Sequence, residues 1–184
     1  MALSKIDGTN FIAPTLPVAS GGTGLTSGFV NGGVNTPAVS AYSNANQTVS
    51  DNTSTKVAFN AELYDTDSAF DTSTYRFTVP SGKAGKYYIF TSVYEYGNNN
   101  DERLKAIDIQ LNGAVVRRYE IFGDSGTGFS NGGNVNLSAV LDLSAADYIE
   151  IFGKLDVNSG TPAFYGAASA ASRYTVLEIF RLLE

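Results

Sequence analysis

The 184-residue chain contains no cysteine, no histidine and no tryptophan. The lack of cysteine excludes a disulfide scaffold, a thiolate nucleophile and a thiolate zinc site. The lack of histidine excludes Ser-His-Asp and Cys-His catalysis and the commonest transition-metal ligand. The 18 Asp and Glu residues leave room for a carboxylate pair of the glycosidase type, but no spacing selects one. We therefore expect that the protein is not an enzyme.

Charge is also scarce. Charged residues make up 16% of the chain, against about 25% in an average domain. The net charge is −6, and the densest basic spot is Arg117-Arg118, so we expect no nucleic-acid binding. No apolar run approaches the length of about 18 residues that a membrane span needs. Polar residues interrupt the N-terminal stretch, so we expect synthesis in a cytoplasm without a signal peptide and no membrane insertion.

The first 36 residues differ in composition from the rest. This stretch holds two charged residues, two prolines and two glycine clusters, and it sustains no apolar period. Such a segment cannot by itself bury enough apolar surface to offset its ordering entropy. It is either a flexible leader or an arm that orders against a partner. In the second case its anchors would be the spaced apolar residues Ile6, Phe11, Ile12, Leu16, Val18, Leu25 and Phe29.

From residue 37 onward the pattern predicts one strand after another. Asn112-Gly113 lies between two alternating runs over 104–122 and is a strong signal for a hairpin, because a type I′ turn needs positive φ at both positions. Ile107 and Ile109 should share one face of that hairpin. The run 167–172 reads as a loop rather than a helix. We expect an all-β sandwich, most simply a jelly roll, with further strands at 75–79, 86–96, 134–143, 147–155 and 173–183.

The spacing of large residues in this second zone resembles the globular head of complement C1q and its tumour-necrosis-factor-like relatives. The resemblance covers roughly residues 38–184 and includes the opening stretch VSAYSNANQTVSDNTSTKVAFN and the closing stretch RYTVLEIFRLL. Ile89 and Thr91 stand where the pattern prefers aromatic residues. The positions that carry the resemblance are Phe59, Asp65, Phe70 and Phe77, followed two residues late by Gly85 and Tyr87.

This resemblance implies a C1q/TNF-like jelly roll that assembles as a compact homotrimer. It also implies that Phe59, Phe70, Phe77 and Tyr87 are core residues that join two sheets, and that Tyr88 points to the opposite face of its strand. Large aromatic residues would line the threefold seam. Our candidates for the seam are Tyr88, Phe90, Tyr94, Tyr148, Phe152, Phe164, Tyr165, Tyr174 and Phe180. For Phe164 and Tyr165, stacking on a sugar ring is the alternative.

A short segment of the leader, LPVASGGTG at 16–24, resembles a stretch common in bacteriophage tail-fibre and virion proteins. Together the two resemblances predict a docking leader over 1–36 and a trimeric domain over 37–184. The expected function is that of a structural virion protein, a fibre or knob. It would attach to other virion proteins by its leader and bind a host-surface glycan or protein. The alternatives are a capsid-decorating or head-fibre protein, and a secreted lectin-like or cytokine-like ligand.

Two further sets of residues are candidates for binding. Asp65, Asp67 and Asp71 could supply oxygen ligands to calcium, although turns capped by aspartate explain the same cluster. No other cofactor is indicated. Receptor contacts, if they lie on the long loops, would involve Asn98, Asn99, Asn100, Asp101, Arg103, Phe129 and Asn131. The alternative is that these loops are solvated connections and that Phe129 packs beneath its own loop.

Overall fold

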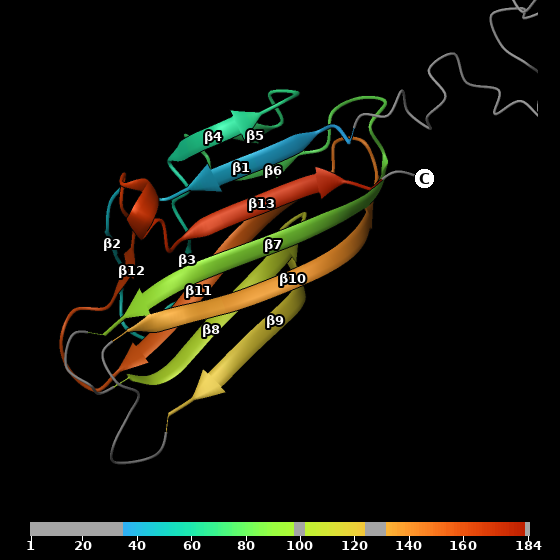
Figure 1. Cartoon of the computed structure of the whole chain (residues 1–184). Coiled ribbons are helices and arrows are strands. Elements are labelled where there is room, and N and C mark those ends of the chain that lie inside the picture. Colours follow the sequence, from blue (N-terminus) through green and yellow to red (C-terminus); the bar gives the residue numbers. More distant parts are fainter. Residues whose placement is uncertain (1–34, 98–101, 124–131, 183–184) are drawn as a thin grey trace, which may run out of the picture. The chain divides into compact units, whose positions relative to one another are not determined.

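The structure is a computed structural model, and it describes residues 35–97, 102–123 and 132–182. Two antiparallel sheets pack against each other within one compact unit, Thr36–Leu182 (Figure 1). The described residues contain no α-helix. A single 3-10 turn, η3 (Ala170–Ser172), lies in the stretch that the sequence analysis assigned to a loop.

Sheet A is built around the long strand β7 (Gly85–Tyr96). β10 (Gly133–Leu143) pairs along one edge of β7, and two shorter strands follow one another along its other edge. The strands on that other side, in order, are β12 (Ala163–Tyr165) with β2 (Gln47–Thr48) beside it, then β13 (Val176–Arg181) with β1 (Ala38–Tyr42) and β4 (Ala61–Asp65) beside it.

Sheet B lies behind sheet A in Figure 1 and is built around β11 (Tyr148–Val157). One edge of β11 pairs with the hairpin strands β8 (Glu102–Leu111) and β9 (Ala114–Phe122). The other edge pairs with β3 (Thr55–Lys56) and β6 (Arg76–Thr78), and β5 (Phe70–Asp71) closes that side.

The predicted hairpin is confirmed. Asn112 and Gly113 connect β8 to β9 with φ values of 52° and 82°, the positive pair that a type I′ turn requires. All the strands that the sequence analysis placed by range are present, with ends shifted by a few residues. The sequence analysis did not separate the short strands β2, β3, β4, β5 and β12.

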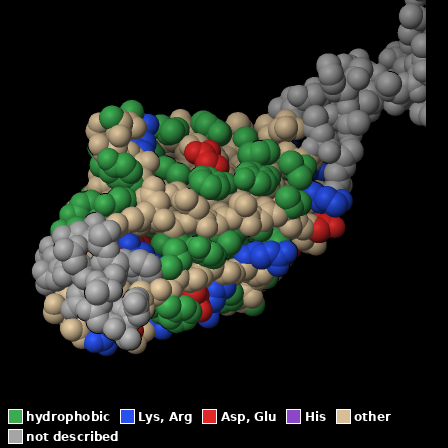
Figure 2. All heavy atoms as spheres, turned by 60° about the horizontal axis from the view of Figure 1, so that its bottom comes forward, with side chains coloured by type: hydrophobic (Ala, Val, Ile, Leu, Met, Phe, Trp, Pro, Cys, Tyr) green, Lys and Arg blue, Asp and Glu red, His purple; other side chains and the backbone are tan. Residues whose placement is uncertain are grey.

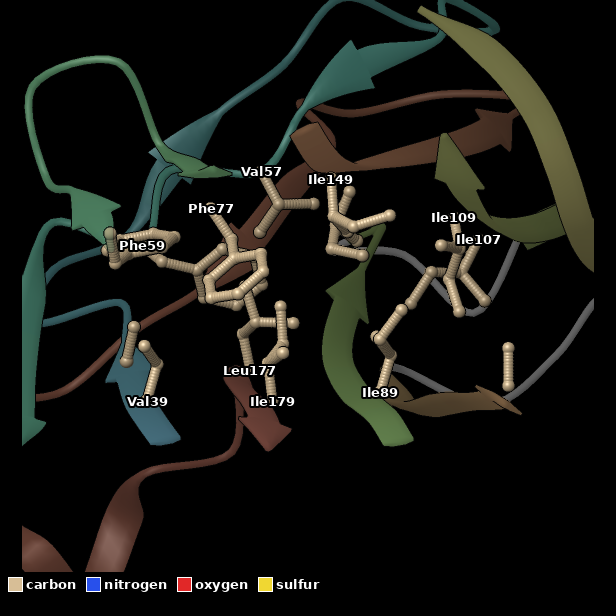
Figure 3. Packing of buried hydrophobic residues seen from close by; sticks show 14 of the residues in the cluster. Val39, Val57, Phe59, Phe77, Ile89, Ile107, Ile109, Ile149, Leu177 and Ile179 are labelled. Atoms are coloured by element: carbon tan, nitrogen blue, oxygen red, sulfur yellow. The ribbon is translucent and has the colours of Figure 1, made fainter. Parts of the chain in front are cut away.

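The core between the sheets contains the predicted aromatic residues (Figure 3). Phe59, Phe77 and Tyr87 are completely buried, and Phe70 is 7% exposed. The rings of Phe77 and Tyr87 meet edge to face with centroids 5.6 Å apart. Because all four residues are buried, the core that the resemblance implied is confirmed. Burial of each such side chain contributes about 1.5–3 kcal/mol to stability.

Gly153 of β11 makes room for a second aromatic residue in the interior. A Cβ at this position would lie 2.5 Å from Cζ of Phe164, and 3.2 Å from Oε1 of Glu95. Real Cβ atoms do not approach other atoms as closely as the first of these distances. Phe164, which is 1% exposed, can therefore insert between the sheets only because residue 153 lacks a side chain.

The sandwich has two distinct ends. At one end the chain enters and leaves the unit side by side, because the N–H of Arg181 donates to the carbonyl of Pro37 at 3.1 Å. The N–H of Leu182 donates nearby to the carbonyl of Lys86, close to the start of β7. At the far end of β7, roughly 40 Å away at ~3.3 Å per residue, Gly97 leads out of the strand. We call these the terminal end and the loop end.

Candidate functional site

The outward side of sheet A carries most of the aromatic residues that are only partly buried. Residues directly opposite one another on paired strands point to the same side of a sheet, so the register of β7 with its neighbours fixes the membership of this surface. We call it face A. Its large side chains are Tyr42, Tyr64, Tyr88, Phe90, Tyr94, Tyr96, Val140, Tyr165, Val176 and Phe180.

Several of these rings contact one another, in two separate groups. Tyr88 and Phe180 have centroids 5.2 Å apart, and Tyr94 lies 5.6 Å from Tyr165 and 5.3 Å from Tyr174. Several of them remain open to solvent: Tyr64 is 50% exposed and Val140 is 51% exposed. Figure 2 shows hydrophobic side chains gathered on the surface that it presents. Exposed large apolar side chains gathered on one face are typical of an interaction site.

One carboxylate lies among the aromatic residues of face A, away from its edges. Glu178 of β13 stands opposite Phe90 on β7 and opposite Ser40 on β1. Oγ of Ser40 donates to Oε1 of Glu178 at 2.7 Å, and the hydroxyl of Tyr64 donates to Oε2 at 3.5 Å. Burial raises the pKa of Glu178 above its ordinary value of 4.5, and the two hydrogen bonds offset only part of that effect.

The outward side of sheet B, which we call face B, is organised by ion pairs. Glu150 of β11 is 5% exposed and accepts both Lys56 Nζ at 2.5 Å and Arg76 Nε at 2.8 Å. Arg118 of β9 binds both carboxylate oxygens of Asp108, at 2.6 and 2.7 Å. The buried carboxylates of face B are thus matched by cations from neighbouring strands.

The electrostatics of face B follow from this pairing. Burial alone would raise the pKa of Glu150, but the hydrogen bonds and charges of Lys56 and Arg76 outweigh it and hold the pKa below 4.5. The guanidinium of Arg76 also lies 3.9 Å from the ring centroid of Tyr148, a cation–π contact. The charges of face B are therefore largely engaged within the face.

The loop end is held together by one buried carboxylate. Oε1 of Glu102, at the start of β8, accepts the N–H of Gly97 at 2.6 Å and the N–H of Gly132 at 3.1 Å. Its Oε2 lies 2.6 Å from Nζ of Lys105, and both side chains are almost fully buried. Glu102 therefore joins the end of β7 to the residue that leads into β10.

A second carboxylate of the loop end has no comparable partner. Glu95 is completely buried, and neither of its oxygens makes a well-formed hydrogen bond. Burial raises the pKa of Glu95 well above its ordinary value. Lys105 and the backbone N–H groups of Ala106 and Lys154 offset only part of that rise, and Glu102 adds to it. Glu95, Glu102 and Lys105 were not singled out by sequence, although Glu95 and Lys105 each break an inward-facing run of apolar residues.

The structure divides the predicted seam residues between three places. Tyr88, Phe90, Tyr94, Tyr165 and Phe180 lie together on face A, and Tyr174 contacts them through Tyr94. Tyr148 and Phe152 lie on face B instead, because their positions on β11 alternate with the buried Ile149 and Ile151. The prediction that Phe164 lies in the seam is wrong, because its side chain fills the interior against Gly153. Tyr42, Tyr64, Tyr96 and Val176 belong to face A and were not predicted.

The three aspartates proposed for calcium serve local turns. Asp65 accepts the N–H of Phe70 at 2.8 Å, and Asp71 accepts the backbone and hydroxyl of Ser73 at 2.8 and 2.6 Å. Asp67 pairs with Lys83 at 3.2 Å. Within the described ranges no group of three or more acidic side chains converges on a common point.

Of the predicted receptor contacts, Arg103 lies in β8 and donates to Oδ1 of Asn158 at the loop end. The other predicted contacts lie outside the described residues: Asn98, Asn99, Asn100, Asp101, Phe129 and Asn131. The leader anchors do so too: Ile6, Phe11, Ile12, Leu16, Val18, Leu25 and Phe29. In the part of the chain that the structure describes, no helix is long and apolar enough to span a bilayer.

Comparison with known proteins places the fold. No family model and no curated protein matches the sequence. Among solved structures, the globular domain of zebrafish complement 1qA protein is similar with a TM-score of 0.55 and 20% identity, over 79% of this chain and 97% of that chain. Eiger TNF from S. frugiperda is similar with a TM-score of 0.59 and 12% identity, over 81% of this chain and 94% of that one. The chain therefore has the predicted all-β, C1q/TNF-like jelly-roll fold.

Proposed function

We propose that the protein is a non-catalytic, homotrimeric binding module that assembles through face A and presents its loop end to a receptor. The single observation that carries this proposal is face A itself. It gathers partly exposed aromatic residues on one sheet, whereas the opposite sheet carries matched charges. The trimer is the assembly that the C1q/TNF resemblance implies, and a second copy of a chain with few charges suits an apolar face.

The two ends of the sandwich support the direction of presentation. Residues 37 and 182 lie at the terminal end, whereas Gly97, Glu102 and Gly132 gather at the loop end. A tether that joins the domain at Pro37 therefore leaves the loop end free. Three identical loop ends on one particle would gain avidity for a host-surface glycan or protein over a single weak site.

In its narrower form the proposal is a bacteriophage fibre or knob, docked to other virion proteins through residues 1–36. The segment LPVASGGTG at 16–24 favours it. A capsid-decorating or head-fibre role would use the same arm, and copy number per particle separates the two, with few trimers at a tail or many on a head. A cytokine-like or lectin-like ligand is the second candidate, favoured by the structural similarity to a TNF.

The first experiment is the mass of the purified protein in solution, measured by light scattering on a gel-filtration peak. We expect three times the 19.5 kDa of one chain, unchanged on tenfold dilution. A stable monomer would contradict assembly through face A.

A deletion of residues 1–30 tests the narrower form. We expect a folded trimer that no longer joins particles when it replaces the full chain during infection. Normal incorporation of the truncated chain would contradict the docking role. Specific binding of the isolated trimer to animal cells would favour the ligand instead.

A further inference from the structure

Glu178 is the acidic side chain in the middle of face A, so a second copy that covers this face would cover it. It lies in the middle strand of the path β7-β13-β1, so aromatic or small residues flank it on both sides. Phe90 stands opposite it on β7 and Ser40 on β1, while Val176 and Phe180 precede and follow it on the same side of β13. Water reaches the carboxylate only from the side that assembly would close.

The described chain supplies no cation to this carboxylate. The pKa of Glu178 is shifted by its own burial and by hydrogen bonds from Ser40 and Tyr64, and no lysine or arginine is among the groups that act on it. β1 has no charged residue. Charged residues on the other strands of sheet A around this position are Glu62 and Asp65 of β4, Lys86 and Glu95 of β7, Asp142 of β10 and Arg181 of β13.

The cationic side chains nearest to this position on sheet A lie beside groups other than Glu178. Arg181 donates to the carbonyl of Ala84 at 2.7 Å, and Lys86 stands opposite Asp142 in the register of β7 and β10. Arg173 lies over the ring of Tyr42 at 4.4 Å. Face A thus differs from face B, where each buried carboxylate has a cation from a neighbouring strand.

Removing water from an unpaired carboxylate is costly, and protonation relieves that cost. We propose that assembly through face A takes up one proton at Glu178 of each copy, so that acid favours the trimer. This inference rests on the proposed function, because it needs face A to be the surface that assembly covers. The neutral carboxyl would keep Ser40 as a partner and could donate its own proton to an oxygen within the interface. The raised pKa of Glu178 in the single chain already lies in this direction.

Sedimentation equilibrium of the full chain between about pH 5 and about pH 8 tests the proposal. Three protons per trimer make the monomer–trimer association constant fall by as much as a thousandfold per pH unit, wherever Glu178 is ionised in the monomer and protonated in the trimer. Glu178→Gln mimics the protonated state and should assemble tightly with a much flatter pH dependence. Asp142→Asn is the matched control, since it removes an exposed acidic charge from the β10 edge of the same face and should keep the wild-type slope.

The outcomes separate this inference from the function on which it rests. A trimer whose strength does not change with pH, or changes equally in Glu178→Gln, overturns the proton uptake and leaves the trimer standing. A trimer that weakens in acid overturns it too, and indicates that the neighbouring copy brings a cation to Glu178. A monomer at every pH overturns the assembly itself. Circular dichroism at each pH confirms that all variants remain folded over the range compared.

Discussion

The two outer faces of this sandwich satisfy their side chains in different ways. On face B, Glu150 and Asp108 are nearly buried, and each is matched by Lys or Arg from the next strand, so the face is electrostatically complete within one chain. On face A, Tyr88 packs against Phe180 and Tyr94 packs against Tyr165, and these rings remain partly open to water. A surface complete in itself needs no partner, whereas an exposed aromatic surface gains free energy when it is covered. The contrast supports the proposal that face A is the face for assembly.

The largest effect should come from placing a charge at the centre of the aromatic contacts. We expect Tyr88→Glu to weaken self-association at least about a hundredfold, because the new carboxylate would be desolvated against Phe180. The measurement is the solution mass across a dilution series. Phe122→Glu is the control, since Phe122 is 71% exposed on the face B side of β9 and its change should leave the mass unaltered. Equal loss in both variants would remove the distinction between the faces.

Glu95, which is buried between the two sheets, tests what a carboxylate costs when its neighbours compensate its burial only in part. The pKa of Glu95 is raised in the fold, so its unfavourable contribution is absent below about pH 4.5, the unfolded value, and grows as the pH rises toward the folded pKa. We expect wild-type stability to fall by up to about 1.4 kcal/mol per pH unit over that interval, and Glu95→Gln to remove this slope. Urea unfolding at several pH values measures it.

Glu102→Gln is the companion variant for that experiment. It leaves a neutral amide where Gly97, Gly132 and Lys105 all donate, so we expect it to destabilise the fold although it too removes a buried charge. Stabilisation by both variants would show that loss of any charge at the loop end is favourable.

Removing the central acid of face B should have a smaller effect. Glu150→Ala leaves Lys56 and Arg76 without their shared partner, both of them partly exposed, and we expect a loss of about 1–3 kcal/mol in urea unfolding. Because the pKa of Glu150 is lowered, this contribution is full above pH 4.5 and disappears as the pH falls through the folded value. The exposed Glu120→Ala on the same face should cost almost nothing. Neither variant should alter the solution mass.

The smallest effect concerns the backbone of two turns, one within sheet B and one that leads into it. Gly113 has a φ of +82°, so Gly113→Ala should cost about 1 kcal/mol without changing assembly. Ala146, with a φ of +71°, provides the inverse case, and Ala146→Gly should be neutral or stabilising. A loss in both variants would mean that backbone strain does not determine these turns.

Local patterns were enough to predict the longer strands, and the resemblance to the C1q head predicted the aromatic core. Asn112-Gly113 specified its turn through φ alone, and the resemblance to the C1q head implied that Phe59, Phe70 and Phe77 lie inside. The alternation of side chains along a strand also predicted that Tyr87 and Tyr88 point to opposite faces of the sheet. These features depend on a few neighbouring residues, and the fold cannot readily change them.

The division of residues between the two faces could not be predicted in this way. Alternation shows that Tyr148 and Phe152 share one side of a strand, but not in which sheet that strand lies. Phe164 needed the absence of a side chain at Gly153, eleven positions earlier and in the other sheet. The sequence does contain one signal for the buried charges. Glu95 and Lys105 occupy inward positions in alternating apolar runs, and a charged residue at such a position indicates a buried polar cluster.

The hydrogen bond between Arg181 and Pro37 places the first and last residues of the described unit next to each other. A short linker across that gap would join the ends, and the chain could be reopened at the 112–113 turn with the order of strands in both sheets retained. The same proximity determines how the domain can be displayed. A fluorescent protein, a bead or a biosensor surface attached at either end would emerge from the same pole. The loop end would then face the solution in every such arrangement.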